Sequence, residues 1–126
     1  STKNNNTIIF HNSFNNKKIH ILKKKGITLI KSRLDSKKLF NLRIVLKKLY
    51  TLGTRNLLVE GGDKITKNLI QNRLIDKFYL FKSPKNLLTK RKHVIFSSFS
   101  ILNGNYKNKS KLSSKLAKDN ITIYKR

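Results

Sequence analysis

Short apolar runs alternate along this chain with segments whose apolar residues recur at helical spacing. The clearest helical segment covers residues 39–52, where leucines and a valine recur three and four residues apart and Gly53 follows as a stop signal. Residues 57–59 are apolar throughout, as in a central parallel strand covered on both faces. This alternation predicts an α/β fold with a mostly parallel sheet flanked by helices.

The other expected elements follow from the same two periodicities. Strands are predicted at residues 7–11, 27–30, 77–81 and 93–96. Helices are predicted at residues 17–25 and 63–72, although residues 19–21 also alternate like a strand. Loops are expected at residues 32–35 and 103–105. Residues 111–118 should turn at Asp119 and Asn120 into a last strand at 121–124, which makes an antiparallel C-terminal hairpin.

The stretch that follows residues 57–59 has a distinctive chemistry. Glu60, the only glutamate, precedes Gly61 and Gly62 at the start of the expected helix. In open α/β sheets, ligands bind at the carboxyl ends of strands, and free amides at a helix start favour phosphate. A carboxylate there could accept a hydrogen bond from a heterocycle or a sugar. The same pattern equally allows a tight strand-to-helix turn with an incidental charge.

The net charge of +25 raises the alternative of a small basic nucleic-acid-binding protein. The lysines are spread along nearly the whole chain, which indicates a compositional bias toward lysine and solvated surfaces. We therefore expect no nucleic-acid partner. Binding that falls steeply with salt would support the alternative.

The chain lacks the residues that several other kinds of functional site require. The chain has no cysteine, and His11, His20 and His93 do not have metal-ligand spacing, so we expect no metal. His11, at the end of the first expected strand, is the histidine best placed to face a ligand. The aromatic residues of 77–81 resemble a base-stacking set but are more typical of a core. Because no long uncharged apolar run exists, we expect no membrane span. The absence of cysteine fits an intracellular setting, and we expect the cytoplasm.

Two blocks carry a resemblance to a known family. Residues 52–62 read LGTRNLLVEGG, and residues 69–85 read LIQNRLIDKFYLFKSPK. They are similar to the "G-x-x-x-[IVL]-L-V-E-G-G" and "[GN]-L-[IV]-D-E-…-[AS]-P-K" blocks of the C-terminal reductase domain of the bifunctional riboflavin-biosynthesis deaminase/reductase. The two blocks occur in the same order and at a similar separation in that family.

The resemblance implies a dihydrofolate-reductase-like fold that binds NADPH. The family reduces the ribosyl group of 5-amino-6-(5-phosphoribosylamino)uracil, a phosphorylated pyrimidine, by hydride transfer to C1 of the opened ribose. By position, Glu60 is similar to the glutamate that contacts substrate. The residues similar to the segment along the cofactor phosphates are Gly61, Gly62, Asp63, Lys64, Ile65 and Thr66. The resemblance assigns no catalytic residue here.

The chain departs from the family in three places. Lys77 follows Asp76 where the family commonly has glutamate, which indicates a change at the surface. Asp63 stands where the family often has a small residue or proline, and its charge would compete with a cofactor phosphate. The family also has a first portion ahead of the expected strand at 7–11, and the chain contains no methionine. We therefore expect residues 1–126 to be the later part of a single reductase domain, inactive alone.

The resemblance also bears on partners. It implies an upstream deaminase domain in the full-length protein, and it allows a homodimer. It equally allows a related reductase of the same fold that acts on a pteridine or a dephosphorylated pyrimidine.

Overall fold

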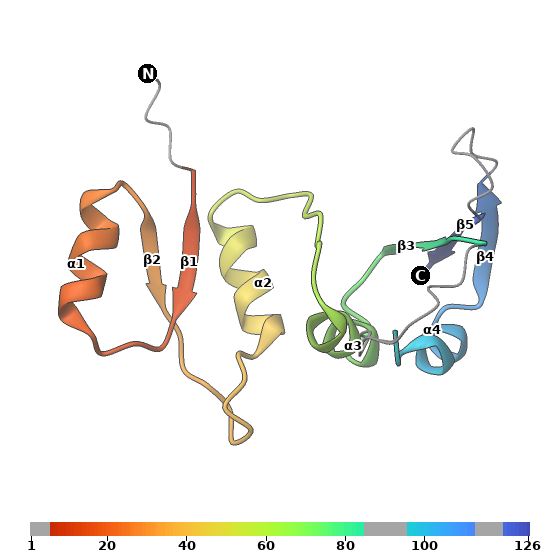
Figure 1. Ribbon diagram of the computed structural model, residues 1–126, viewed down its shortest axis with the longest axis horizontal. Coiled ribbons are helices and arrows are strands. Elements are labelled where there is room, and N and C mark those ends of the chain that lie inside the picture. The colour runs from red at the N-terminus through yellow and green to blue at the C-terminus, as the bar shows by residue number, and fades with distance from the viewer. Residues whose placement is uncertain (1–5, 85–95, 113–119) are drawn as a thin grey trace. The chain divides into compact units, whose positions relative to one another are not determined.

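The computed structural model describes residues 6–84, 96–112 and 120–126 (Figure 1). The chain forms two compact units, Ser1–Leu57 and Leu58–Arg126, and each has its own sheet. No helix within the described ranges is long and apolar enough to cross a membrane. The fold therefore mixes helices and strands in both units, as the alternating sequence pattern predicts.

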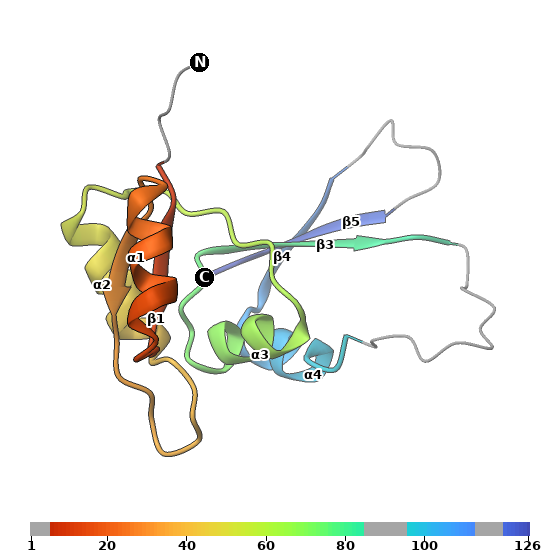
Figure 2. The same ribbon diagram turned by 60° about the vertical axis from the view of Figure 1, so that its left-hand side comes forward.

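In the first unit a helix joins two parallel strands. β1 (Ile8–His11) pairs with β2 (Thr28–Lys31) in a register that aligns His11 with Lys31. α1 (Asn16–Lys24) connects the strands and lies beside β2 (Figure 1). Because the strands are parallel, their carboxyl ends meet at the same edge of the sheet. The unit ends with α2 (Leu42–Thr51), which Figure 2 shows on the side of the sheet opposite α1.

Asparagine side chains cap the N-termini of both helices of this unit. The Asn15 Oδ1 atom accepts a hydrogen bond of 3.0 Å from the Lys18 amide at the start of α1. The Asn41 Oδ1 atom accepts bonds of 3.1 Å from Arg43 N and 3.3 Å from Ile44 N at the start of α2. These caps satisfy amides that the first helical turn leaves without partners. They explain why α2 begins three residues after the predicted start at 39.

Three helices end in the same way. In α1 and α2 the closing residues are Gly26, with φ 76°, and Gly53, with φ 95°. Each is followed by an amide that bonds back across the last turn: Ile27 N to Leu22 O at 3.2 Å, and Thr54 N to Leu49 O at 3.1 Å. α3 ends similarly at Arg73, with φ 53°. Glycine adopts this left-handed conformation without strain, which is why the sequence marks the first two helix ends.

The second unit packs two helices on an antiparallel sheet. α3 (Asp63–Gln71) and α4 (Phe99–Asn105) lie on the same face of the strands β3 (Lys77–Lys82), β4 (Asn108–Leu112) and β5 (Asn120–Lys125) (Figure 2). The strand order is β3-β5-β4. The buried core consists of Ile70, Leu102, Tyr106 and Tyr124.

Most predicted elements are present. The described structure confirms the strands predicted at 7–11, 27–30, 77–81 and 121–124, the helices at 17–25, 39–52 and 63–72, and the antiparallel C-terminal pairing. Of the strand predicted at 93–96, residues 93–95 lie outside the described residues, and Phe96 belongs to no strand. Residues 113–119, which include Asp119 of the predicted turn, also lie outside them, and Asn120, the other residue of that turn, is instead the first residue of β5.

Three predictions are wrong. The sheet is not mostly parallel, because only β1 and β2 pair in parallel and β3, β5 and β4 are antiparallel. Residues 57–59 do not form a strand: no strand in the described ranges pairs with them, and Leu58 is 81% exposed. Residues 103–105 are not a loop but the last turn of α4, which buried Leu102 anchors in the core.

Candidate functional site

The glycine turn, defined as residues 60–62, lies directly before α3 in the second unit. It follows the irregular segment 54–59. Glu60 is exposed, and no donor among the described residues bonds to its carboxylate. This side chain therefore keeps its full capacity to accept hydrogen bonds from a ligand.

The two glycines have different surroundings. A Cβ on Gly61 would lie 3.1 Å from Cγ2 of Ile65 and 3.2 Å from its Cβ, which is closer than side chains normally pack. A Cβ on Gly62 would meet no atom within 4 Å. Gly62 also has φ −71° and ψ 172°, a conformation that any residue adopts. Packing inside the unit therefore favours glycine at 61 but does not require it at 62.

The start of α3 is open. Gly62 is its N-cap, and no side chain caps the helix. The Gly62 carbonyl accepts bonds from Ile65 N at 3.1 Å and Thr66 N at 3.2 Å. Thr66 Oγ1 donates to the Gly61 carbonyl at 3.5 Å. The first amides of the helix thus have no protein side chain as acceptor, and such amides attract anions.

Two further residues expected to line the cofactor, Lys64 and Ile65, differ in character. Lys64 is exposed in the first turn of α3 and adds positive charge there. Ile65 is 47% exposed, and its side chain is the one that lies against Gly61. The six residues predicted for the cofactor are therefore contiguous on the turn and the first helical turn.

The Asp63 carboxylate accepts hydrogen bonds from a residue outside α3. Its Oδ1 atom accepts a hydrogen bond from Ser97 N at 3.1 Å, and its Oδ2 atom accepts one from Ser97 Oγ at 2.9 Å. The carboxylate does not cap its own helix. At the other end of the same helix pair, Asn105 Nδ2 donates to the Ile70 carbonyl at 3.1 Å. The Asn105 bond joins α4 to α3, and the Ser97 bonds join α3 to the segment that precedes α4.

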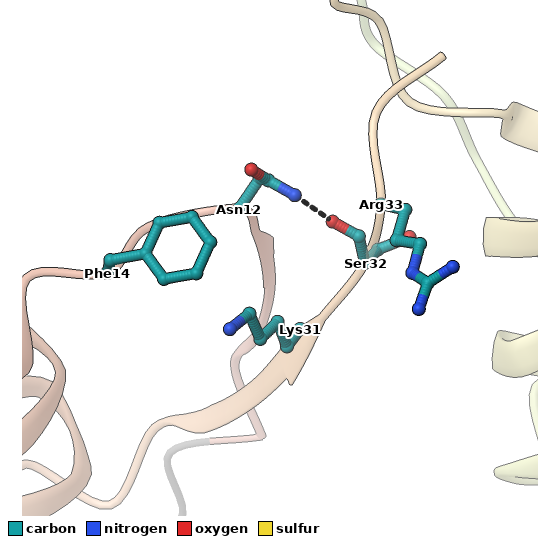
Figure 3. A pocket seen from close by; sticks show the side chains of 5 residues that line it. All are labelled: Asn12, Phe14, Lys31, Ser32 and Arg33. Carbon is teal, nitrogen blue, oxygen red and sulfur yellow. Dashed lines mark hydrogen bonds between the residues drawn. The ribbon is translucent and has the colours of Figure 1, made fainter.

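A basic pocket lies at the carboxyl edge of the β1–β2 sheet in the first unit. It encloses about 460 Å³ and is lined by Asn12, Phe14, Lys31, Ser32 and Arg33 (Figure 3). Asn12 Nδ2 donates to the Ser32 carbonyl at 2.8 Å, which joins the two strand ends. The Lys31 amine lies 4.1 Å from the centre of the Phe14 ring, and the Arg33 guanidinium lies on the other side of Ser32 (Figure 3).

The sequence reasoning above missed this pocket. The signal was present: polar or basic residues follow two neighbouring parallel strands, at the edge where ligands of α/β sheets bind. Lys31 and Arg33, on opposite sides of Ser32, give this edge positive charge that suits an anionic ligand. His11 lies at the same edge, but its Nδ1 atom accepts a bond of 3.3 Å from Ser13 N, so the backbone uses this nitrogen.

The aromatic residues of β3 are the other candidates for a binding role. Phe78 packs in the core, with ring centroids 5.9 Å from Phe96 and 6.4 Å from Tyr124. Tyr79 and Phe81 alternate to the other face and are 47% and 61% exposed, so the expectation of a core role holds only for Phe78. Within the described ranges no three His, Cys, Asp or Glu residues gather as a metal site would require.

Comparison with known proteins points to one family. No curated protein matches the chain. A family model described as the RibD C-terminal domain matches residues 1–122, which includes the glycine turn, the basic pocket and every strand except the last three residues of β5. This match agrees with the two sequence blocks at 52–62 and 69–85, and the family implies a dihydrofolate-reductase-like fold. The chain therefore belongs to the RibD C-terminal domain family, the reductase domain of riboflavin biosynthesis.

Proposed function

We propose that the protein containing this chain reduces 5-amino-6-(5-phosphoribosylamino)uracil with NADPH to the ribitylamino product. The observation that carries the proposal is the family match over residues 1–122. Both units would then be parts of one reductase domain. NADPH, when bound, supplies the hydride, and the residues of this chain bind and orient the reactants.

The glycine turn fits the phosphates of a dinucleotide. Gly62 has open space where a side chain would stand, and the first amides of α3 lack a side-chain cap. Exposed Lys64 adds a positive charge beside these amides. Backbone donors, a helix start and a nearby cation together favour a phosphate oxygen. We assign this turn to the cofactor.

The basic pocket is a second anion site in the proposal. Lys31 and Arg33 supply two cations, and the Phe14 ring supports the Lys31 amine. The volume of about 460 Å³ has room for a phosphate with part of its sugar. The pocket therefore suits a phosphate group, which both NADPH and the phosphorylated pyrimidine carry.

Glu60 is assigned to the substrate. Its carboxylate is exposed and accepts no hydrogen bond from the described residues. A pyrimidine with amino and ring N–H groups offers the donors that such a carboxylate needs. Hydrogen bonds to a charged acceptor are among the stronger polar contacts, so the loss of this one should be measurable.

The assignment is tested by Glu60→Gln in the full-length protein. The glutamine keeps the shape of the side chain but removes its charge, so KM for the pyrimidine should rise while the Kd for NADPH stays unchanged. Asp76→Asn, at an exposed acid outside the turn, is the matched control and should change neither constant. Equal losses of NADPH and pyrimidine binding in Glu60→Gln would contradict the role given to Glu60.

A further inference from the structure

The carboxylate of Asp63 lies at the first residue of a helix whose start is proposed to hold a phosphate. A negative charge at this position stabilises the helix, because it interacts with the same amides that an anionic ligand would use. It would therefore compete with that ligand. The chain nevertheless has an aspartate here, immediately after Gly62.

In the structure, Ser97 occupies both oxygens of this carboxylate. The main-chain amide of Ser97 reaches Oδ1 at 3.1 Å, and its hydroxyl reaches Oδ2 at 2.9 Å. The two residues are 34 positions apart, so the contact is tertiary and not a local cap. The helix itself receives no side-chain cap. Asp63 is thus held by a partner outside α3, and the first amides of the helix stay accessible.

We propose that Ser97 is a positioning residue for the cofactor: it binds the Asp63 carboxylate and keeps it from the amides that receive a phosphate. The inference rests on the proposed function and adds a residue to the same site. The hydroxyl of Ser97 is the part that substitution can remove, because its amide remains in every variant. Without the hydroxyl, one oxygen of Asp63 has no partner and is free to turn toward the start of α3.

The experiment measures equilibrium NADPH binding and the free energy of unfolding in the full-length protein. Ser97→Ala should weaken NADPH binding by roughly two- to five-fold, the effect expected of a charge at an exposed helix start. The loss should shrink at high salt, because exposed charges are screened. The double variant Asp63→Asn with Ser97→Ala should recover the affinity, since no charge is left to compete. Ser100→Ala, at an exposed serine of α4, is the matched control and should bind as the unmodified protein does.

The double variant separates positioning from simple tethering. If the contact only held α3 to the segment before α4, the double variant would lose as much affinity as Ser97→Ala, and that result overturns the inference. Unchanged NADPH binding in Ser97→Ala also overturns it while leaving the proposed function intact. Failure of the unmodified protein to bind NADPH would instead overturn the proposed function and this inference together.

Discussion

Gly61 lies against the side chain of Ile65, such that a Cβ at position 61 would be 3.1 Å from the Ile65 Cγ2 atom. A Cβ on its neighbour Gly62 would have no atom within 4 Å. Internal packing therefore accounts for the first glycine, and the proposed cofactor accounts for the second. Substitutions at the two glycines can therefore separate an effect on the free energy of unfolding from an effect on ligand binding.

We expect Gly62→Ala to leave the free energy of unfolding within about 0.5 kcal/mol of the unmodified protein. The new methyl group would stand where the cofactor approaches, so NADPH binding should weaken by on the order of ten-fold, or about 1.4 kcal/mol. Gly61→Ala is the companion variant and should lower the free energy of unfolding by about 1 kcal/mol through its contact with Ile65. Denaturant titration and NADPH titration measure the two effects; intact NADPH affinity in Gly62→Ala would argue against a cofactor at this turn.

The basic pocket gives a second prediction. Lys31→Ala should weaken the binding of phosphorylated ligands to this pocket, with NADPH as the probe, because it removes a cation that lies against the Phe14 ring. Lys24→Ala removes the same charge from the exposed end of α1 and serves as the control. Both variants should be titrated with NADPH at low and moderate salt. If they bind equally well, only the overall charge matters and the pocket is not a specific site.

Tyr106 gives a prediction about alkaline pH. The side chain is buried, and its hydroxyl makes no hydrogen bond of full geometry within the described ranges, although the nearby Ile75 backbone acts on its pKa against the effect of burial. Burial raises the pKa of the Tyr106 phenol above its ordinary value of about 10. The unfolded chain therefore releases this proton first as the pH rises. The contribution to stability is complete below pH of about 10 and is lost as the pH rises through the folded-state pKa.

Tyr106→Phe should remove this alkaline loss. Because the hydroxyl makes no hydrogen bond of full geometry, its removal should leave the free energy of unfolding at neutral pH unchanged or raise it by about 1 kcal/mol. Denaturant unfolding at neutral and alkaline pH gives both values. Tyr79→Phe, at a half-exposed tyrosine of β3, is the control for the loss of a phenol hydroxyl elsewhere in the unit. A marked destabilisation of Tyr106→Phe at neutral pH would mean that the hydroxyl has a favourable partner after all.

The parts of the fold that the sequence predicts well carry their signals locally. α1 and α2 have asparagine caps within a few residues of their start and a glycine at their end. β1 and β2 are short β-branched runs that pair with each other. Such signals depend on neighbours along the chain, and this is why β1, α1, β2 and α2 occur in the predicted order.

The wrong predictions all concern residues whose structure depends on distant partners. An apolar run such as residues 57–59 becomes a strand only where another strand takes its hydrogen bonds, and none among the described strands does so. Residues 103–105 have the composition of a turn, yet Asn105 bonds to the Ile70 carbonyl and Leu102 is fully buried. Tertiary contacts override the local preference in that segment.

In the candidate site, too, the local motif could be predicted from the sequence and the tertiary contacts could not. The motif places Glu60, Gly61 and Gly62 beside the start of α3, and the structure has them there. The contact between Asp63 and Ser97 could not be read from the sequence, because 34 residues separate the two. The basic pocket needed the parallel register of β1 and β2, which brings Asn12 and Ser32 together.

The transfer of an isotope label tests the central proposal most directly. The full-length protein would be supplied with 5-amino-6-(5-phosphoribosylamino)uracil and with NADPH that carries deuterium in its transferable C4 position. The proposal predicts one deuterium at C1 of the ribityl chain of the product, with one NADPH consumed for each product formed. No consumption of NADPH, or a product without the label at C1, would contradict the assigned reaction.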